Sequence, residues 1–320
     1  MESNMKKYIL KRVFYAIIAL FMVSTITFFA VRIIPGNPIE QMTEKLPADI
    51  QQQIFEQYGF DKPISEQYKL FFKELFLHGD LGESIKYRGR KVTDTIFTYA
   101  PVSGLLGLEA IVIGVLSGII LGIIAALNRA KWLDYLVMFI AVVGISVPNF
   151  VLATCFQYFL TMKLHLFPTT GWEGFSYTVL PALALSFNST AKYARYMRAN
   201  CLNILNQDFI LTAKAKGMSR FRLVRKHVLK NSILPIVTLL GPQIALMFGG
   251  AFVIESIFAI PGLGSYFVSS VTDRDYTMVM GQTIFIAALY ILSVLIVDIL
   301  YGFIDPRIRI AQQGGEKGGK

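Results

Sequence analysis

Few side chains in this chain of 320 residues could carry out covalent chemistry, and they are scattered along it. The three histidines, His78, His165 and His227, belong to no H-E-x-x-H pattern of the kind that binds zinc on a helix. Cys155 lies in an apolar run and Cys201 in a basic segment, so the two cysteines indicate neither a disulfide framework nor a metal site. The sequence therefore predicts no catalytic residue and no metal ligand.

The tail GGEKGGK is the only stretch that resembles a nucleotide site. Gly314 to Lys320 fits G-x-x-x-x-G-K, but no Ser or Thr follows the lysine, and neither a strand nor a helix is predicted beside it. We expect a flexible tail or an expression scar. The chain is accordingly expected to bind no cofactor and to hydrolyse no nucleotide by itself.

The composition indicates a membrane protein. Hydrophobic residues make up 54% of the chain and charged residues only 16%, against ~25% in soluble domains. The net charge of +10 is then read by location, as a signal of membrane orientation, and no nucleic-acid partner is predicted. The apolar run from Val13 to Val31 is too long for a signal peptide and lacks a cleavage site, so we expect a retained first span.

Six apolar segments are long enough to cross a bilayer, which takes ~20 residues. They are 13–34, 101–127, 133–161, 178–199, 233–258 and 279–303. Lys and Arg gather before the first segment, between the second and third, in 192–230 and after the sixth, and such residues concentrate on the cytoplasmic side. This pattern predicts an all-α polytopic membrane protein with six transmembrane helices and both termini in the cytoplasm.

The remaining segments complete the predicted organisation. Residues 1–34 form the cytoplasmic N-terminus and first span, 35–100 a small extracytoplasmic segment, 101–304 a core of five spans, and 305–320 a cytoplasmic tail. Within 35–100 we expect two amphipathic helices that form a cap on the outer surface. The second has one apolar face made by Tyr68, Phe71, Phe72, Leu75 and Phe76.

Polar residues inside apolar segments are candidates for a transport pathway, because they are costly in lipid. Glu109, Glu255 and Asp298 are the ionisable residues at membrane depth, and their isolation argues against a proton relay. The polar half of the fourth segment predicts a broken, polar-ended span that faces protein or water; alternatively, Lys192 and Arg195 reach the membrane surface. The candidate pathway residues are Asn149, Gln157, Ser186, Asn188 and Glu109.

The segment 201–232 combines small and basic residues. Asp208 is a candidate N-cap, good helix formers run from Phe209 to Lys216, and Gly217 is a helix stop. A second basic helix is expected over about Ser219 to Asn231. Two readings stay open from these residues alone: a helix that docks on a protein, or one that lies on anionic lipid.

This segment resembles the coupling helix of ABC importer permeases. DFILTAKAKG, followed by RKHVLKNSILP, is similar to the peptide and nickel branch, and further matches are PGNP, GDLGES, GISVPNF, VIESIFAIPGLG, RDYTMVMG and YGFIDPRIR. Leu211 departs from the broader superfamily, which has a Glu there. The resemblance implies a type I ABC importer permease fold, with the ATPase contact formed by Asp208, Thr212, Ala213, Lys214, Ala215, Lys216 and Gly217.

The resemblance also implies the partners. It predicts a second, homologous permease subunit, two cytoplasmic ATPases that use ATP and Mg, and an extracellular peptide-binding (lipo)protein, in the plasma membrane of a bacterium. The expected cargo is oligopeptides, with dipeptides or nickel chelates as alternatives. A self-sufficient ion-coupled carrier is the alternative from another class, and an intramembrane enzyme lacks paired catalytic residues.

Overall fold

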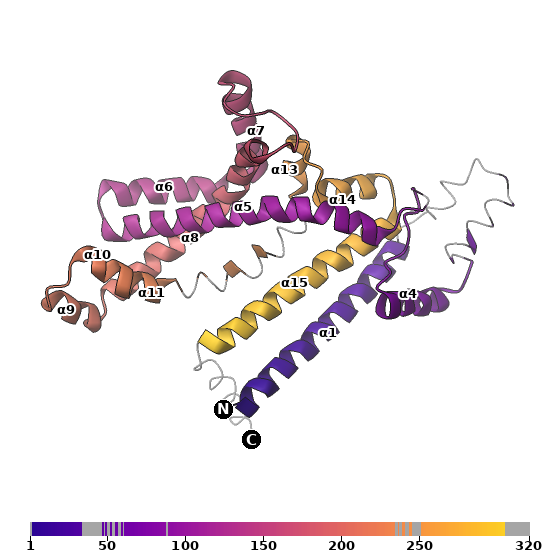
Figure 1. Ribbon diagram of the computed structural model, residues 1–320, viewed down its shortest axis with the longest axis horizontal. Helices are drawn as coiled ribbons and strands as arrows, with labels where there is room; N and C mark the ends of the chain where they lie inside the picture. The colour runs from indigo at the N-terminus through magenta and orange to yellow at the C-terminus, as the bar shows by residue number, and fades with distance from the viewer. Residues whose placement is uncertain are drawn as a thin grey trace.

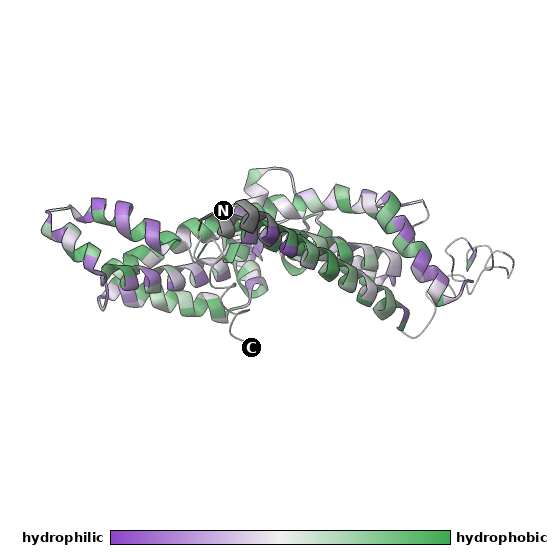
Figure 2. Cartoon of the chain, turned by 90° about the horizontal axis from the view of Figure 1, so that it is seen from below, coloured by the Kyte–Doolittle hydropathy of each residue, from purple (hydrophilic) through white to green (hydrophobic). Residues whose placement is uncertain are grey.

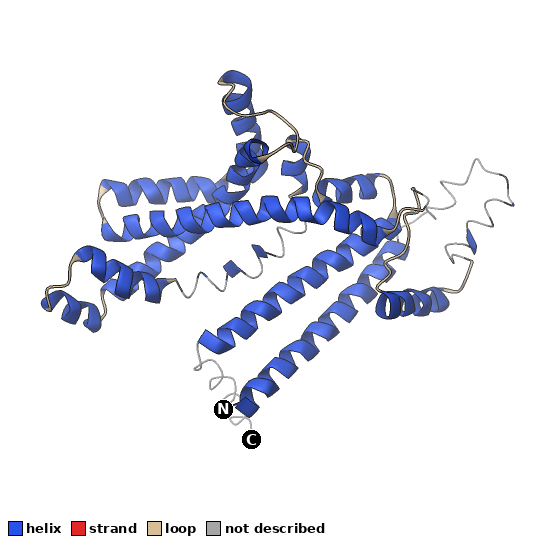
Figure 3. Cartoon of the chain, in the orientation of Figure 1, coloured by secondary structure: helices blue, strands red, loops and turns tan. Residues whose placement is uncertain are grey.

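A computed structural model describes residues 2–33, 61–87, 89–233 and 251–304, with isolated positions between these ranges. Every regular element among them is a helix, which confirms the all-α class (Figure 3). The elements are α1 (Glu2–Ile33), α4 (Ile64–His78), α5 (Val92–Leu127), α6 (Trp132–Ser146), α7 (Asn149–Phe156), the π-helix η1 (Gln157–Lys163), α8 (Phe175–Leu205), α9 (Asp208–Ala215), α10 (Arg220–Leu223), the π-helix η2 (Val224–Val228), α11 (Leu229–Ser232), α13 (Phe252–Ile257), α14 (Leu263–Thr272) and α15 (Tyr276–Ile304).

Three of these helices are long and apolar enough to cross a membrane: Lys7–Ile33, Val92–Leu127 and Tyr276–Ile299. A fourth crossing results if Trp132–Ser146 and Asn149–Lys163, which are bent by 104°, form one broken span. Most of the predicted fifth span, the predicted first amphipathic helix and the tail lie outside the described residues. The six-span count therefore stays a prediction.

The broken span is the third segment and not the fourth, contrary to the sequence-based expectation. α8 is one continuous helix of 31 residues with Pro181 inside it. The break falls between α6 and α7, where Val147 is extended at φ −86° and ψ 124°. Pro148 explains it, because proline disfavours helical backbone at the preceding residue and offers no N–H to the preceding turn.

The most extensive helix contact joins α5 to α8 along a ridge of three glycines. A Cβ built on Gly118 would lie 2.5 Å from the Cβ of Tyr193, and one on Gly122 would lie 2.6 Å from the Cβ of Met197. Gly114 is less crowded, with 3.0 Å to the Cβ of Ser189. Because each glycine faces the residue 75 positions later, the two helices run parallel, and the hydroxyls of Ser117 and Thr190 form a hydrogen bond of 2.8 Å across the contact.

Parallel α5 and α8 require the chain between them to return to its starting side, and α6 makes the first part of that return (Figure 1). An ion pair holds α6 against α8: Arg198 donates to both oxygens of Asp134, over 2.6 and 2.7 Å. The Ala130 N–H also donates to Asp134. Gly144 adds a second close contact, since a Cβ there would lie 2.9 Å from the Cβ of Ala191.

α1 and α15 form an antiparallel pair that lies beside this group (Figure 1). At one end Arg12 forms an ion pair of 2.8 Å with Asp298, one of the three carboxylates at predicted membrane depth. Towards the other end Phe28 packs with Met280 and Ile284. Asp298 therefore has a structural partner. Figure 2 shows long apolar stretches on these helices.

The second predicted amphipathic helix is α4, and the N-terminal part of its predicted aromatic face packs on α1, whereas Phe76 is exposed. Its Tyr68 and Phe71 rings lie 5.3 and 5.6 Å from the ring of Phe28. Phe72 lies 5.1 Å from Phe21, deep in the apolar run of α1. α4 therefore packs along the side of α1 and does not sit as a cap beyond its end.

Two of the motifs that carry the family resemblance bind each other where α4 leads into α5. Asp275, buried at the start of α15, accepts hydrogen bonds from the Ser84 hydroxyl, the Ile85 N–H (3.1 Å) and the Met278 N–H (3.2 Å). Gly82, at φ +90°, leaves no room for a side chain. This contact joins the C-terminal part of GDLGES to RDYTMVMG and holds the loop before α5 at the start of α15.

A more exposed ion pair lies next to the Ser84–Asp275 contact. Lys86 forms an ion pair with Asp273, and the hydrogen bond to this carboxylate raises the pKa of Lys86. The Tyr87 hydroxyl donates to the same carboxylate over 3.4 Å. Both partners are at least partly exposed, so the pair is expected to orient the loop more than to stabilise it.

We predict that alanine substitutions along the glycine ridge destabilise the protein to different degrees. Gly118→Ala and Gly122→Ala should each lower the free energy of unfolding by about 1–3 kcal/mol, since the new methyl group meets helix backbone as well as a Cβ. Gly114→Ala serves as the control and should cost less. Thermal unfolding of the purified complex in detergent ranks the three variants by melting temperature. Equal melting temperatures for all three would contradict this packing.

Candidate functional site

The segment singled out by the sequence forms a short helix with a defined end. α9 covers Asp208–Ala215, close to the predicted Phe209–Lys216. Its C-terminus is a Schellman motif: the Gly217 N–H donates to the Lys214 carbonyl over 2.9 Å, and the Met218 N–H to the Ala213 carbonyl over 3.2 Å. Gly217 has φ +74°, the left-handed conformation that this motif needs and that favours glycine.

The start of α9 differs slightly from the prediction. Asp208 is the first helical residue and not the N-cap, which is Gln207, and no side chain caps this end. The Asp208 carboxylate still lies where the helix dipole favours negative charge. The Thr212 hydroxyl donates to the Asp208 carbonyl over 3.1 Å and so stays within the helix.

α9 has one face turned to its own chain and one face exposed. Ile210 and Ala213 are buried in a cluster with Met197 and Cys201 of α8. The remaining residues of the predicted contact, together with two large apolar side chains, are exposed: Asp208, Phe209, Leu211, Thr212, Lys214, Ala215, Lys216 and Gly217. Ala213 thus fixes α9 to α8, whereas the exposed residues are free to meet another molecule.

The chain after α9 anchors it to the long helices. α10, η2 and α11 form one continuous helical run where a second basic helix was predicted. Arg220 donates to the Leu127 carbonyl over 2.6 Å, at the last residue of α5. Leu223 and Val228 join the same buried cluster as Ile210. α9 is therefore held by both α5 and α8.

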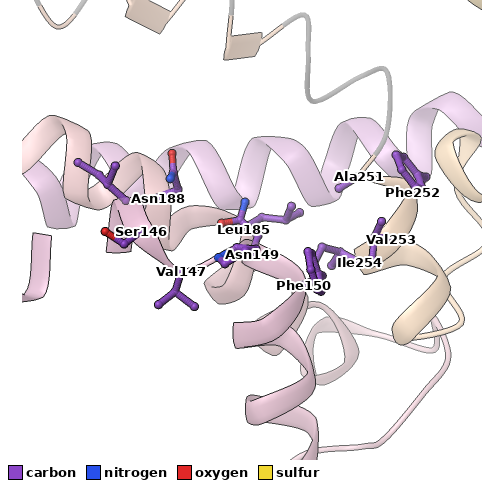
Figure 4. Close-up of a pocket in the computed structure, with 12 residues that line it drawn as sticks. Ser146, Val147, Asn149, Phe150, Leu185, Asn188, Ala251, Phe252, Val253 and Ile254 are labelled. Atoms are coloured by element: carbon purple, nitrogen blue, oxygen red, sulfur yellow. The ribbon is translucent and has the colours of Figure 1, made fainter. Parts of the chain in front are cut away.

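A cavity of about 440 Å³ lies where α6 and α7 separate (Figure 4). Its walls come from the break itself, from α8 and from the start of α13, and are formed by Ile145, Ser146, Val147, Pro148, Asn149, Phe150, Leu185, Asn188, Ala251, Phe252, Val253 and Ile254. The motif GISVPNF thus supplies one wall and VIES another. In a membrane protein, irregular backbone at this depth is tolerated only against protein or a wet cavity.

The structure separates the five predicted pathway residues into two groups. Asn149 and Asn188 line the cavity. Gln157 instead donates to the carbonyls of Ile257 (3.0 Å) and Thr169 (3.1 Å), and buried Ser186 donates to the Leu183 carbonyl of its own helix. Glu109 is half-buried on α5, away from the cavity lining.

Glu255 has a structural role that its position in the sequence did not reveal. Its fully buried carboxylate accepts from the Ser103 hydroxyl (2.7 Å), the Ser265 N–H (2.8 Å) and the Ala251 N–H (3.2 Å). Ser103 in turn accepts from the Leu263 N–H over 2.8 Å. The carboxylate and the hydroxyl together cap α14 and tie α13, a wall of the cavity, to α5.

The glycine of IPGLG is required by this arrangement. A Cβ on Gly262 would lie 2.5 Å from the Glu255 carboxylate and 2.6 Å from the Ser103 hydroxyl. Neither Ser103 nor Ala251 was predicted from the sequence as a functional residue. A serine in an apolar helix gives no signal by itself, whereas Pro148 between two apolar runs could have located the break.

Comparison with known proteins shows two family models on this chain. Residues 118–310, more than half of it, match the family described as "Binding-protein-dependent transport system inner membrane component". Residues 5–89 match the N-terminal model of the membrane component of such systems. The chain belongs to this family.

Curated relatives agree over nearly the whole length. The dipeptide transport system permease protein DppB of Bacillus subtilis is 41% identical over 310 residues, 97% of this chain and 100% of the relative. The oligopeptide transport system permease protein OppB of Escherichia coli K12 is 40% identical over 308 residues, 95% and 100% of the two chains. A crystal structure of an amino acid ABC transporter overlaps 67% of this chain and 94% of its own, at 21% identity and a TM-score of 0.48.

This membership identifies the chain as a permease component of the inner membrane, working in a system that depends on a binding protein. Its role is transport, and the chain is not itself an enzyme, as the sequence predicted. The permease family match covers both the α9 segment and the cavity. Both places therefore belong to the part of the chain that the family shares.

We predict that Glu255→Gln destabilises the permease although it preserves shape. All the groups that face the carboxylate donate hydrogen bonds, so the new amide would set a donor against a donor, typically a loss of about 1–3 kcal/mol. The exposed Glu173→Gln is the matched control. Thermal unfolding in detergent should separate the two variants; an unchanged melting temperature for Glu255→Gln would argue against the capping role.

Proposed function

We propose that this chain is a permease subunit of an ATP-driven importer of oligopeptides. With a second, homologous permease subunit it forms the translocation pathway, and it crosses the membrane six times with both termini in the cytoplasm. An extracellular peptide-binding (lipo)protein delivers the cargo, and two cytoplasmic ATPases that use ATP and Mg drive the cycle. The observation that carries the proposal is the exposed α9 helix, anchored to two long helices of a permease.

The arrangement of the helices supports the proposed topology. α5 and α8 run parallel, which fits one membrane crossing between them in the chain. α1 and α15 run antiparallel, which fits the four crossings that six spans put between them. The basic residues of α9 to α11 lie at the end of α5 that Arg220 caps. The positive-inside rule puts that end in the cytoplasm.

The two faces of α9 support docking on a protein over lying on lipid. A surface-lying helix keeps its apolar face free for lipid, whereas Ile210 and Ala213 are already buried against α8. The exposed face carries Lys214 and Lys216 beside Phe209 and Leu211. Large apolar groups ringed by cations suit a cleft in a partner. Leu211 faces outwards, so it takes part in this contact in place of the missing Glu.

The cavity supports alternating access at the α6–α7 break. Asn149 and Asn188 present carboxamides there, and the broken backbone provides further polar groups at a depth where lipid cannot satisfy them. We place the pathway along this wall. Both relatives described above are named for peptide transport, which favours peptides over nickel chelates as the cargo.

Transport by the reconstituted complex tests the function. Proteoliposomes with both permeases, both ATPases and the binding protein should accumulate a radiolabelled peptide only with ATP, and a protonophore should leave uptake unchanged. Uptake that persists without the ATPases and collapses with the proton gradient would support an ion-coupled carrier instead.

We predict that Ala215→Trp weakens docking of the ATPase without disturbing the membrane domain. The side chain is exposed on the free face of α9, so a bulky group should obstruct a fitted cleft and lower association roughly tenfold or more. Lys230→Trp, exposed on α11, is the control. Co-purification of the ATPases from membranes measures the effect, and normal recovery with Ala215→Trp would contradict the proposed contact.

A further inference from the structure

We propose that the cavity at the α6–α7 break receives one uncharged, apolar side chain of the peptide in transit, while Asn149 and Asn188 bind the peptide main chain. This inference rests on the proposed peptide import and assigns a selective step to the permease itself. The cavity of about 440 Å³ lies within the ~300–1,000 Å³ range of small-ligand pockets. It is therefore large enough for any natural side chain.

The walls exclude charge. Apolar side chains dominate them, from Ile145, Val147 and Phe150 on one side to Leu185 on α8 and the start of α13 on the other. None of the twelve described residues that line the cavity is charged, so a Lys or Asp side chain of the cargo would lose water without gaining an ionic partner. An apolar side chain instead gains from burial.

Two carboxamides provide the polar contacts. The Asn188 side-chain N–H donates to the Gly144 carbonyl over 3.3 Å, which holds the amide in place and leaves its oxygen available as an acceptor. Asn149 begins α7 on the opposite wall and forms no side-chain hydrogen bond within the part of the chain that is described (Figure 4). Each peptide unit of a cargo presents one donor and one acceptor, which a carboxamide can match.

The same lining offers no side chain suited to coordinate a nickel ion directly. Among protein side chains, nickel is commonly bound by imidazole. The lining residues contain no His, Cys, Asp or Glu, and no group of metal-binding side chains was found among the described residues. The cavity therefore fits the apolar part of a peptide.

Filling the cavity tests the inference. In proteoliposomes of the complete transporter with saturating binding protein, Val147→Trp should reduce uptake of Ala-Leu-Ala roughly tenfold more than uptake of tri-glycine, the discrimination that a misfit in an apolar pocket gives. Val142→Trp makes the same change on the exposed side of α6, outside the cavity, and should leave the ratio unchanged. Wild-type transporter should also favour Ala-Leu-Ala over Ala-Asp-Ala.

An unchanged ratio of Ala-Leu-Ala uptake to tri-glycine uptake in Val147→Trp would overturn the side-chain site while leaving peptide import intact. Absence of any ATP-dependent peptide uptake by the wild type would instead overturn the proposed function, and this inference with it. A photo-reactive benzoylphenylalanine at position 147 gives an independent measurement if Val147→Trp does not assemble. It should cross-link radiolabelled Ala-Leu-Ala during turnover, and a yield no higher than that at position 142 would equally refute the site.

Discussion

The close parallel contact of α5 with α8 is the interaction on which the rest of the structure depends. Three glycines let the two backbones meet, and the other elements are attached to this pair. The Asp134–Arg198 ion pair adds α6, and the Glu255–Ser103 contact adds α13. α8 also carries both functional places, since Asn188 lines the cavity and Met197 packs under α9. Nine residues of helix, ~14 Å at 1.5 Å per residue, separate them. One helix therefore joins the underside of α9 to the cavity wall.

Three carboxylates in or next to the apolar helices serve structure in the described part of the chain. Asp298 pairs with Arg12, Asp134 with Arg198, and Glu255 accepts three hydrogen bonds. None of these carboxylates reaches the cavity lining. Paired charges inside a bundle commonly mark proton pathways, yet here each joins two helices near one end. These three carboxylates are therefore engaged in helix packing.

Much of the architecture could be predicted from the sequence, because long apolar runs indicate membrane-spanning helices and basic loops indicate the cytoplasmic side. The exposed segment after α8 was placed within a residue by its helix formers and Gly217. The break was assigned to the wrong span, because polar residues in 186–192 outweighed the single Pro148 as a signal. α8 places two of those polar residues against neighbouring helices: Thr190 bonds to Ser117 of α5, and Asn188 donates to the Gly144 carbonyl of α6. Ser103, which donates to Glu255, lies 152 residues before it in the chain, a distance over which sequence spacing carries no information.

Accessibility at the α6–α7 break tests the central claim, that nucleotide at the ATPases opens and closes this cavity. The variant Asn149→Cys, on a background with the exposed Cys155 changed to Ser, places one reactive thiol in the wall. An impermeant maleimide added from outside should label it when the complete transporter is arrested with ATP and vanadate, and should fail to label it without nucleotide. Equal labelling in both states would contradict the account.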